Sequence, residues 1–307
     1  DGTTNLDVVD IDGAVDMAST LAVGGVVTVS NGSNSAPSIA FASDTDTGIY
    51  RGGANTLAFS AGGTARFYSD ASSYIATLTA GTSNTAIGVN AGTNIASGGN
   101  YNVVIGDESG NDLTTGDHNV AIGYGALDAE DTGSKSVAIG YQALTTQNND
   151  SDNYNVAIGY NSGAAITTGV QNTLIGGLAG DANTAADNNT AVGYNALGAN
   201  TTGDSNTVLG AFALDANTTA TANTAIGLSS LGANTTGANN TAVGKDSLLA
   251  NTTGAANVAV GKGALDANTT AGDNTAVGTN SLTDNTTGAL NTAVGNEALA
   301  NNTTADE

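Results

Sequence analysis

The sequence predicts an all-β chain in which a parallel β-solenoid, or β-roll, of thirteen repeats of about 17 residues follows a β-rich module. Three features recur together: a glycine at a short fixed interval, a branched aliphatic residue or leucine directly before it, and a polar residue, nearly always asparagine, four residues before it. Helical repeats need about 33–47 residues, so this interval is too short for them. The repeat glycines are Gly88, Gly106, Gly123, Gly140, Gly159, Gly176, Gly193, Gly210, Gly227, Gly244, Gly261, Gly278 and Gly295.

The repeat array covers residues 84–307, and each repeat suits one coil of two short strands and two turns. Residues before the glycine alternate as in a strand with one face inward. We expect the core to hold the residue before each repeat glycine, such as Ile122 or Ile139, and the leucine that lies four residues after it in nine repeats, such as Leu144. Alanine or serine always precedes that leucine position, which lets neighbouring walls approach each other.

Four repeats carry glycine at the leucine position, and three of them have a large apolar residue three positions later. The glycines are Gly92, Gly110, Gly163 and Gly180, and the later apolar residues are Ile95, Leu113 and Ile166. A loss of volume at one position is thus balanced at a nearby one. This pattern indicates a packed interior of fixed volume.

Two sets of asparagines recur with the repeat and would form columns in a stack of coils. One lies four residues before the glycine, as at Asn119 and Asn172, with Ser136 as its exception; the other includes Asn200, Asn217 and Asn251. Stacked amides can hydrogen-bond along a column, and asparagine also accepts the backbone conformations of tight turns. Both interpretations stay open, and they are compatible.

Residues 1–83 predict a β-rich shaft or connector module, with a boundary to the array near Ala80–Ser83. Short alternating or apolar runs separated by turn residues mark its strands. The expected strands are Asp7–Met17, Leu21–Val29, Pro37–Ala42, Gly48–Arg51, Leu57–Ser60 and Thr64–Tyr68.

The composition excludes several classes of function. The net charge is −23, from 28 acidic and 5 basic residues, and the basic residues are scattered, so we expect no nucleic-acid binding. No apolar run approaches the roughly 20 residues that span a bilayer, so we expect no membrane insertion. The chain has no cysteine and does not begin with methionine, and we expect it to be a piece of a longer or processed polypeptide.

No group of residues suggests catalysis, a cofactor or a metal, and we expect no enzyme. His118 is the only histidine and has no matching ligand nearby in the sequence. Asp107 and Glu108 are adjacent, so on a strand they point apart rather than forming an acid pair. Ice binding needs ranks of outward threonines, but we expect the strand threonines to face inward and the tandem Thr201–Thr202 type to lie in turns.

One possible binding surface is a column of tyrosines at the position after the glycine, which varies and is therefore expected to be exposed. It holds Tyr124, Tyr141, Tyr160 and Tyr194. Exposed tyrosines can stack on sugar rings or contact proteins. They can equally cover a groove between chains, and the sequence leaves both roles open.

A single coil encloses few large side chains, which favours association of several chains. We expect a parallel homotrimer that closes the thin core. The rival is a monomeric triangular helix, which wants an apolar residue on each of three sides, whereas this repeat offers two clear ones.

The phrases Asn119–Gly123, Ser136–Gly140 and Asn155–Gly159 (N-V-A-I-G, S-V-A-I-G and N-V-A-I-G) resemble the head repeats of YadA-like trimeric autotransporter adhesins. Asp44–Phe67 and Asn5–Gly25 resemble bacteriophage tail-fibre shaft sequences. The first resemblance implies a left-handed parallel β-roll in a homotrimer, although that family's repeat is shorter.

Together the resemblances imply a structural tail fibre on a virion surface that presents or forms a host-receptor-binding surface. Its partners would be its own copies, neighbouring fibre or baseplate proteins, and a host surface glycan or protein. The alternative is the head of a bacterial adhesin on the bacterial outer surface.

Overall fold

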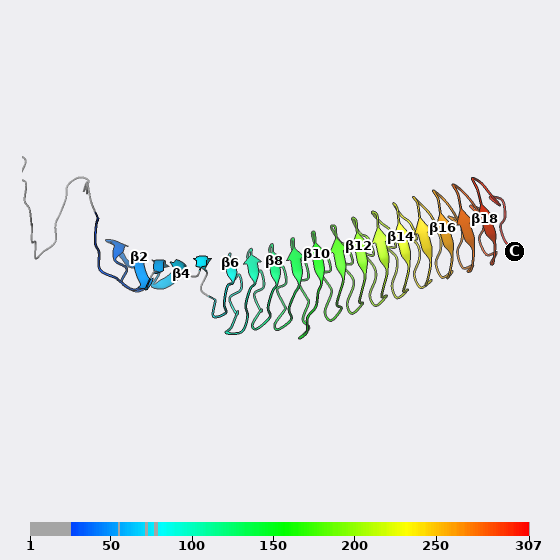
Figure 1. The fold of residues 1–307 in the computed structure, drawn as a ribbon. Helices are drawn as coiled ribbons and strands as arrows, with labels where there is room; N and C mark the ends of the chain where they lie inside the picture. Colours follow the sequence, from blue (N-terminus) through cyan, green and yellow to red (C-terminus); the bar gives the residue numbers. More distant parts are fainter. Residues whose placement is uncertain (1–25, 55, 71–72, 77–78, 307) are drawn as a thin grey trace, which may run out of the picture. The chain divides into compact units, whose positions relative to one another are not determined.

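The computed structural model of the chain describes residues 26–54, 56–70, 73–76 and 79–306. Within these ranges every regular element is a β-strand, and the strands form two separate sheets (Figure 1). The first sheet has five strands in the order β1-β2-β3-β4-β5, and the second has thirteen, β6 to β18, in sequence order. The expected all-β fold with a parallel solenoid of thirteen repeats is confirmed.

The five-stranded sheet is an antiparallel meander. Its strands are β1 (Ile39–Phe41), β2 (Asp44–Gly53), β3 (Thr56–Ala61), β4 (Thr64–Asp70) and β5 (Ser73–Ala76). The first four match expected strands within a few residues, whereas β5 was not predicted. Residues 26–29 form no strand, and the rest of the two earliest expected strands lies outside the described residues.

In the solenoid, each coil contributes one strand of three residues. The bounds are β6 (Thr85–Ile87), β7 (Val103–Ile105), β8 (Val120–Ile122), β9 (Val137–Ile139), β10 (Val156–Ile158), β11 (Thr173–Ile175), β12 (Thr190–Val192), β13 (Thr207–Leu209), β14 (Thr224–Ile226), β15 (Thr241–Val243), β16 (Val258–Val260), β17 (Thr275–Val277) and β18 (Thr292–Val294).

Every strand pairs in parallel with the equivalent residues of the next coil, so Thr190 lies opposite Thr207. The prediction of two strands per coil was wrong. The rest of each coil consists of turns and bends, whose backbones still bond between coils, as when Leu197 N donates to Ala213 O at 3.0 Å.

The core confirms one half of the predicted inward set and corrects the other. The leucine four residues after the glycine is fully buried, as at Leu144, except at the last coil, where Leu299 is half exposed. The residue before the glycine points outward instead: Ile122 and Ile139 are only half-buried. The strand's middle residue, usually alanine, takes the inward place, as at Ala138. The leucine fills the narrow interior, which leaves room for only a small side chain opposite it.

Backbone geometry explains why glycine can replace that leucine. The position has a left-handed backbone in both cases, with φ of 51° at Leu144 and 59° at Gly163. Glycine adopts this conformation without strain, whereas leucine needs burial to offset the strain.

The expected compensation in the glycine coils is confirmed, since Ile95, Leu113 and Ile166 are buried. The fourth coil is filled by the middle strand residue instead: Leu174 Cδ2 lies 2.9 Å from where a Cβ on Gly180 would be.

Both asparagine columns form ladders between coils. In the first, Asn119 N donates to Asn102 Oδ1 at 2.8 Å, and Asn119 Nδ2 donates to Gly133 O at 2.9 Å. In the second, Asn251 Nδ2 donates both to Asn234 Oδ1 and to the carbonyl of its own turn, each at 2.9 Å. The ladder and turn interpretations therefore hold together.

Candidate interaction surface

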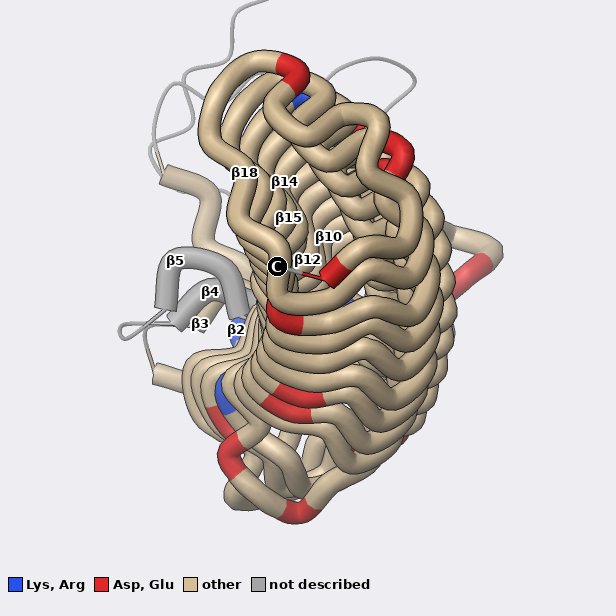
Figure 2. The backbone as a smooth tube through the Cα atoms, turned by 90° about the vertical axis from the view of Figure 1, so that its right-hand side faces the viewer, with Lys and Arg blue, Asp and Glu red and all other residues tan. Residues whose placement is uncertain are grey.

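The outer face of the solenoid sheet is a continuous surface without charge. The first and third residues of each strand point away from the core and are half-buried or exposed. They are valine and isoleucine in β7–β10, and mostly threonine paired with valine, isoleucine or leucine from β11 onward. None of the thirteen described strands contains a charged residue. The acidic residues of the solenoid lie in the turns and bends outside the strands, and Figure 2 marks them in red along the stacked coils.

The strand threonines therefore face outward, and the expectation that they face inward was wrong. In each of these strands the middle residue points into the core. Ala191, between Thr190 and Val192, is an example. The alternation of side chains in a three-residue strand fits two arrangements, with either the middle residue or the two outer residues facing the core. Packing in the core decides which arrangement forms.

Tyr124, Tyr141 and Tyr160 form a stacked column beside this face. Their exposed fractions are 42%, 44% and 57%, so the predicted exposure is confirmed. The ring centroids of Tyr124 and Tyr141 lie 5.4 Å apart, and those of Tyr141 and Tyr160 lie 5.2 Å apart, with interplanar angles of 17° and 11°. The spacing follows the stacking distance of the coils, about 4.8 Å.

This stacking limits what the column can bind. Tyr141 has a tyrosine ring against each of its faces, so a sugar cannot stack on it without displacing a neighbour. The column presents ring edges and hydroxyl groups, which suit contacts with another protein. The hydroxyl of Tyr124 is hydrogen-bonded to the Glu108 carboxylate, whose acceptance of that bond and negative charge raise the pKa of Tyr124.

Tyr194 is exposed but does not extend the stack. Gly177 occupies the intervening coil, and the Tyr194 ring meets Phe212 edge-on, with centroids 5.4 Å apart and an interplanar angle of 74°. The structure thus brings three of the four predicted tyrosines together and leaves the fourth in a separate pair.

A second column of aromatic and basic residues was missed in the sequence. Tyr101, His118, Lys135 and Tyr154 each lie five residues before a repeat glycine, directly before the asparagine column or its serine. Tyr101 and His118 stack with centroids 5.0 Å apart. Lys135 Nζ lies 5.1 Å from the Tyr154 ring centroid and forms an ion pair with Asp152. The four residues recur at the same position of consecutive repeats, and this recurrence would have been enough to predict the column from the sequence.

The coils of β7–β10 thus carry a distinct surface, with valine and isoleucine flanked by two columns rich in aromatic residues. Aromatic residues with an aliphatic centre and charges at the edge are typical of protein–protein interfaces.

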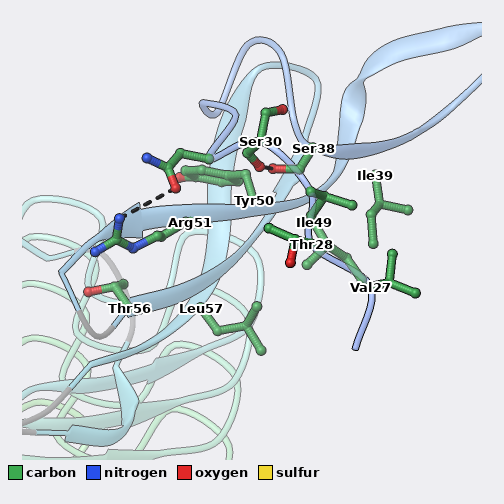
Figure 3. Close-up of a pocket in the computed structure, with 12 residues that line it drawn as sticks. Val27, Thr28, Ser30, Ser38, Ile39, Ile49, Tyr50, Arg51, Thr56 and Leu57 are labelled. Atoms are coloured by element: carbon green, nitrogen blue, oxygen red, sulfur yellow. Dashed lines mark hydrogen bonds between the residues drawn. The ribbon is translucent and has the colours of Figure 1, made fainter. Parts of the chain in front are cut away.

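The five-stranded sheet has a separate open pocket of about 650 Å³ (Figure 3). Val27, Ile39, Ile49 and Leu57 form its apolar lining. Arg51 lies at its edge, where Nη1 donates to Asn31 Oδ1 at 3.4 Å.

This module has little core of its own. Among its residues with described side chains, Ala58 is the one buried hydrophobic residue. Ile39, Phe41 and Leu57 are each more than half exposed. Such exposure is unusual for a sheet that stands alone in water.

The candidate residues for catalysis or metal binding do not lie together in one site. His118 is exposed and stacked on Tyr101. In the turn after β7, Asp107 is exposed and Glu108 is half-buried. No three His, Cys, Asp or Glu side chains gather as a metal site in the described ranges. The same ranges hold no helix long and apolar enough to span a bilayer.

Comparison of the chain with protein-family models, with curated proteins and with solved structures gives no match.

Proposed function

We propose that the chain is a structural fibre protein of a virion, a tail fibre that assembles as a parallel homotrimer and presents a host-receptor-binding surface. The observation that supports it most is the outer face of the solenoid sheet, which is free of charge along all thirteen strands. On a chain of net charge −23, such a face is where copies can approach with least repulsion.

The reason for assembly differs from the one that the sequence suggested. Each coil closes its own interior, because Leu144 and its equivalents are buried within one chain. What remains uncovered is the outer row of residues such as Ile139, which a neighbouring copy would shield. The proposal of three chains per assembly rests on the resemblance to trimeric adhesins and fibres.

The five-stranded module supports the same proposal. Its exposed Ile39, Phe41 and Leu57 would become buried if equivalent modules packed together. A module that depends on its copies for a core is suited to an obligate fibre and poorly suited to a free monomer.

The receptor-binding surface is proposed for the two columns around Tyr141 and Tyr154. Because the Tyr141 faces are covered, a protein receptor fits better than a glycan stacked on the rings. Where copies cover these columns, the tyrosines become assembly contacts instead.

The second candidate is the head of a bacterial surface adhesin, which the N-V-A-I-G phrases of the repeat favour. Antibodies against the array separate the two: they label virions if the chain is a tail fibre, and the cell envelope if it is an adhesin. Labelling of the cell interior alone would contradict both.

Assembly is tested by cysteine cross-linking. The chain has no native cysteine, so the introduced thiol is the only one that can react. Ile139→Cys places a thiol on the outer sheet face, and Thr236→Cys places one in an exposed turn as the matched control. A short bis-maleimide should join copies through the first variant and not through the second. Equal cross-linking of both variants would contradict assembly through the sheet face.

A further inference from the structure

One carboxylate is enclosed in the solenoid, although the rest of the core is uncharged. Glu130 lies seven residues after Gly123 and is fully buried. From Asn183 onward the equivalent position holds asparagine, and in the adjacent coil it holds Gln147. A buried acid is rare unless it is paired, so its surroundings decide its state.

Four N–H groups point at this carboxylate. Gly133 N donates to Oε1 at 2.8 Å, and Asn149 N donates to it at 3.4 Å. Gln147 Nε2 donates to Oε2 at 2.8 Å, and Asn153 Nδ2 donates at 3.0 Å. All four donors are neutral, so they offset only part of the cost of burying a charge.

The first asparagine ladder is interrupted beside this carboxylate. Ser136 stands where the first ladder would have asparagine, and Gln147 bridges the gap: its Nε2 donates to Ser136 Oγ at 2.9 Å, and its Oε1 accepts from Asn155 at 2.8 Å. Leu113 and Ile166 hold the equivalent position of Glu130 in the coils beyond, and both are fully buried. The polar group is thus bounded by apolar side chains along the stack.

In the described ranges, no basic side chain pairs with Glu130. Of the ion pairs between described residues, none includes it: Lys135, the basic residue of this region, pairs with Asp152. The other charged groups of the surrounding turns are acidic, with Asp131 accepting from the Thr114 hydroxyl and Asp150 from the Thr132 hydroxyl. Burial raises the pKa of Glu130, and the hydrogen bonds that it accepts lower it only in part.

A second buried polar atom lies beside the carboxylate. Asn153 Oδ1 is enclosed and has no hydrogen-bond partner, while the Nδ2 of the same amide donates to Glu130. If the amide turns over, Oδ1 takes the place of Nδ2, about 3 Å from Glu130 Oε2, and Nδ2 moves to the enclosed place that Oδ1 held. A protonated Glu130 can donate to it there.

We propose that Glu130 and its surrounding amides form a proton-controlled joint in the solenoid: the coils between Tyr124 and Gly159 close tightly when Glu130 carries a proton, and open locally when it is charged. The folded chain binds this proton more tightly than the unfolded chain does. The stabilisation is therefore complete below the ordinary pKa of glutamate, and it is lost as the pH rises through the higher pKa of the folded state.

The test is hydrogen–deuterium exchange of the assembled full chain at about pH 4 and about pH 8, corrected for the intrinsic pH dependence of exchange. Wild-type protein and Glu130→Gln are compared, with Glu297→Gln as the matched control, since Glu297 is exposed in the last coil. We expect residues 124–159 to exchange faster at the higher pH in the wild type and in the control, and equally at both in Glu130→Gln. The same pH dependence in Glu130→Gln as in the wild type would overturn the proposal.

If Glu130→Gln does not fold, titration of the wild-type carboxyl carbons by NMR decides. A pKa for Glu130 above that of the exposed Glu297 supports the joint. A pKa at or below that of Glu297 overturns it.

Discussion

The carbonyl oxygen of Gly210 lies 2.6 Å from the point where a Cβ on Gly193 would be. Gly193 also has φ of 140°, which side-chain-bearing residues rarely adopt. The same relationship joins each repeat glycine from Gly88 to Gly278 to the next coil, at distances of 2.2–2.6 Å. The glycine that marks the period is thus required by contact between backbones and by conformation together.

Replacing Gly193 by alanine should destabilise the array. The strained backbone alone costs about 1–3 kcal/mol, and the Cβ would also push against the next coil. Gly198→Ala is the matched control, because its Cβ would meet only the end of the Asn195 side chain and other coils carry larger residues there. Chemical denaturation followed by circular dichroism measures both, and equal losses would contradict this account.

The inward and outward directions can be tested in one coil. Leu197→Ala should lower the free energy of unfolding by about 2–5 kcal/mol, because it leaves a cavity in the core. Val192→Ala removes atoms from the outer face and should lower the free energy of unfolding of a dissociated chain much less. A larger loss for Val192→Ala in dissociated chains would indicate that the strand faces the other way.

The period was enough to predict thirteen stacked coils, because equivalent residues such as Ala191 and Val208 must pair once the coils stack in register. Periodicity could not predict the direction of the three-residue strand, since both Ala138 and Ile139 are apolar. The structure shows that leucine from another part of the coil occupies the interior, so the smaller residue turns inward. That choice depends on the shape of the closed coil, which the sequence pattern does not contain.

The asparagine ladder should be stronger in its middle than at its end. Asn251→Ala removes the bonds to Asn234 Oδ1 and to the Gly254 carbonyl, and it takes one of two acceptors from Asn268 Nδ2. The Gly254 carbonyl still accepts from Asn240, so Asn234 Oδ1 is the group that loses its donor, and we expect a loss of about 1–3 kcal/mol. Asn302→Ala, at the partly exposed end, should cost less. Thermal unfolding of the two variants compares them, and equal melting temperatures would show that the ladder contributes little.

The stacked column of Tyr124, Tyr141 and Tyr160 should contribute to the stability of the folded chain as well as to binding. Tyr141→Ala removes two stacked contacts and Tyr160→Ala removes one, so the first should lose more of the near-ultraviolet circular dichroism and more stability, at about 0.5–1.5 kcal/mol per contact. A Tyr160→Ala effect as large as that of Tyr141→Ala would indicate that the rings act independently.

The exposure of the tyrosines could be predicted because their position varies between repeats, whereas the covered faces of Tyr141 could not. Ring orientation depends on neighbours one coil away, and it decides between a sugar platform and a protein contact. Glu130 was also missed, although it stands where later coils carry asparagine. Its burial follows from the closed coil, which the pattern of residues alone does not reveal.

The central claim, that copies assemble through the outer sheet face, is tested most directly by the mass of the protein in solution. Light scattering after size-exclusion chromatography should give three times the 29.6 kDa of one chain. Ile122→Asp with Ile139→Asp, which places charges on that face, should shift the mass toward a single chain while circular dichroism keeps its β signal. A wild-type mass of one chain, or a trimer that survives both aspartates, would contradict the account.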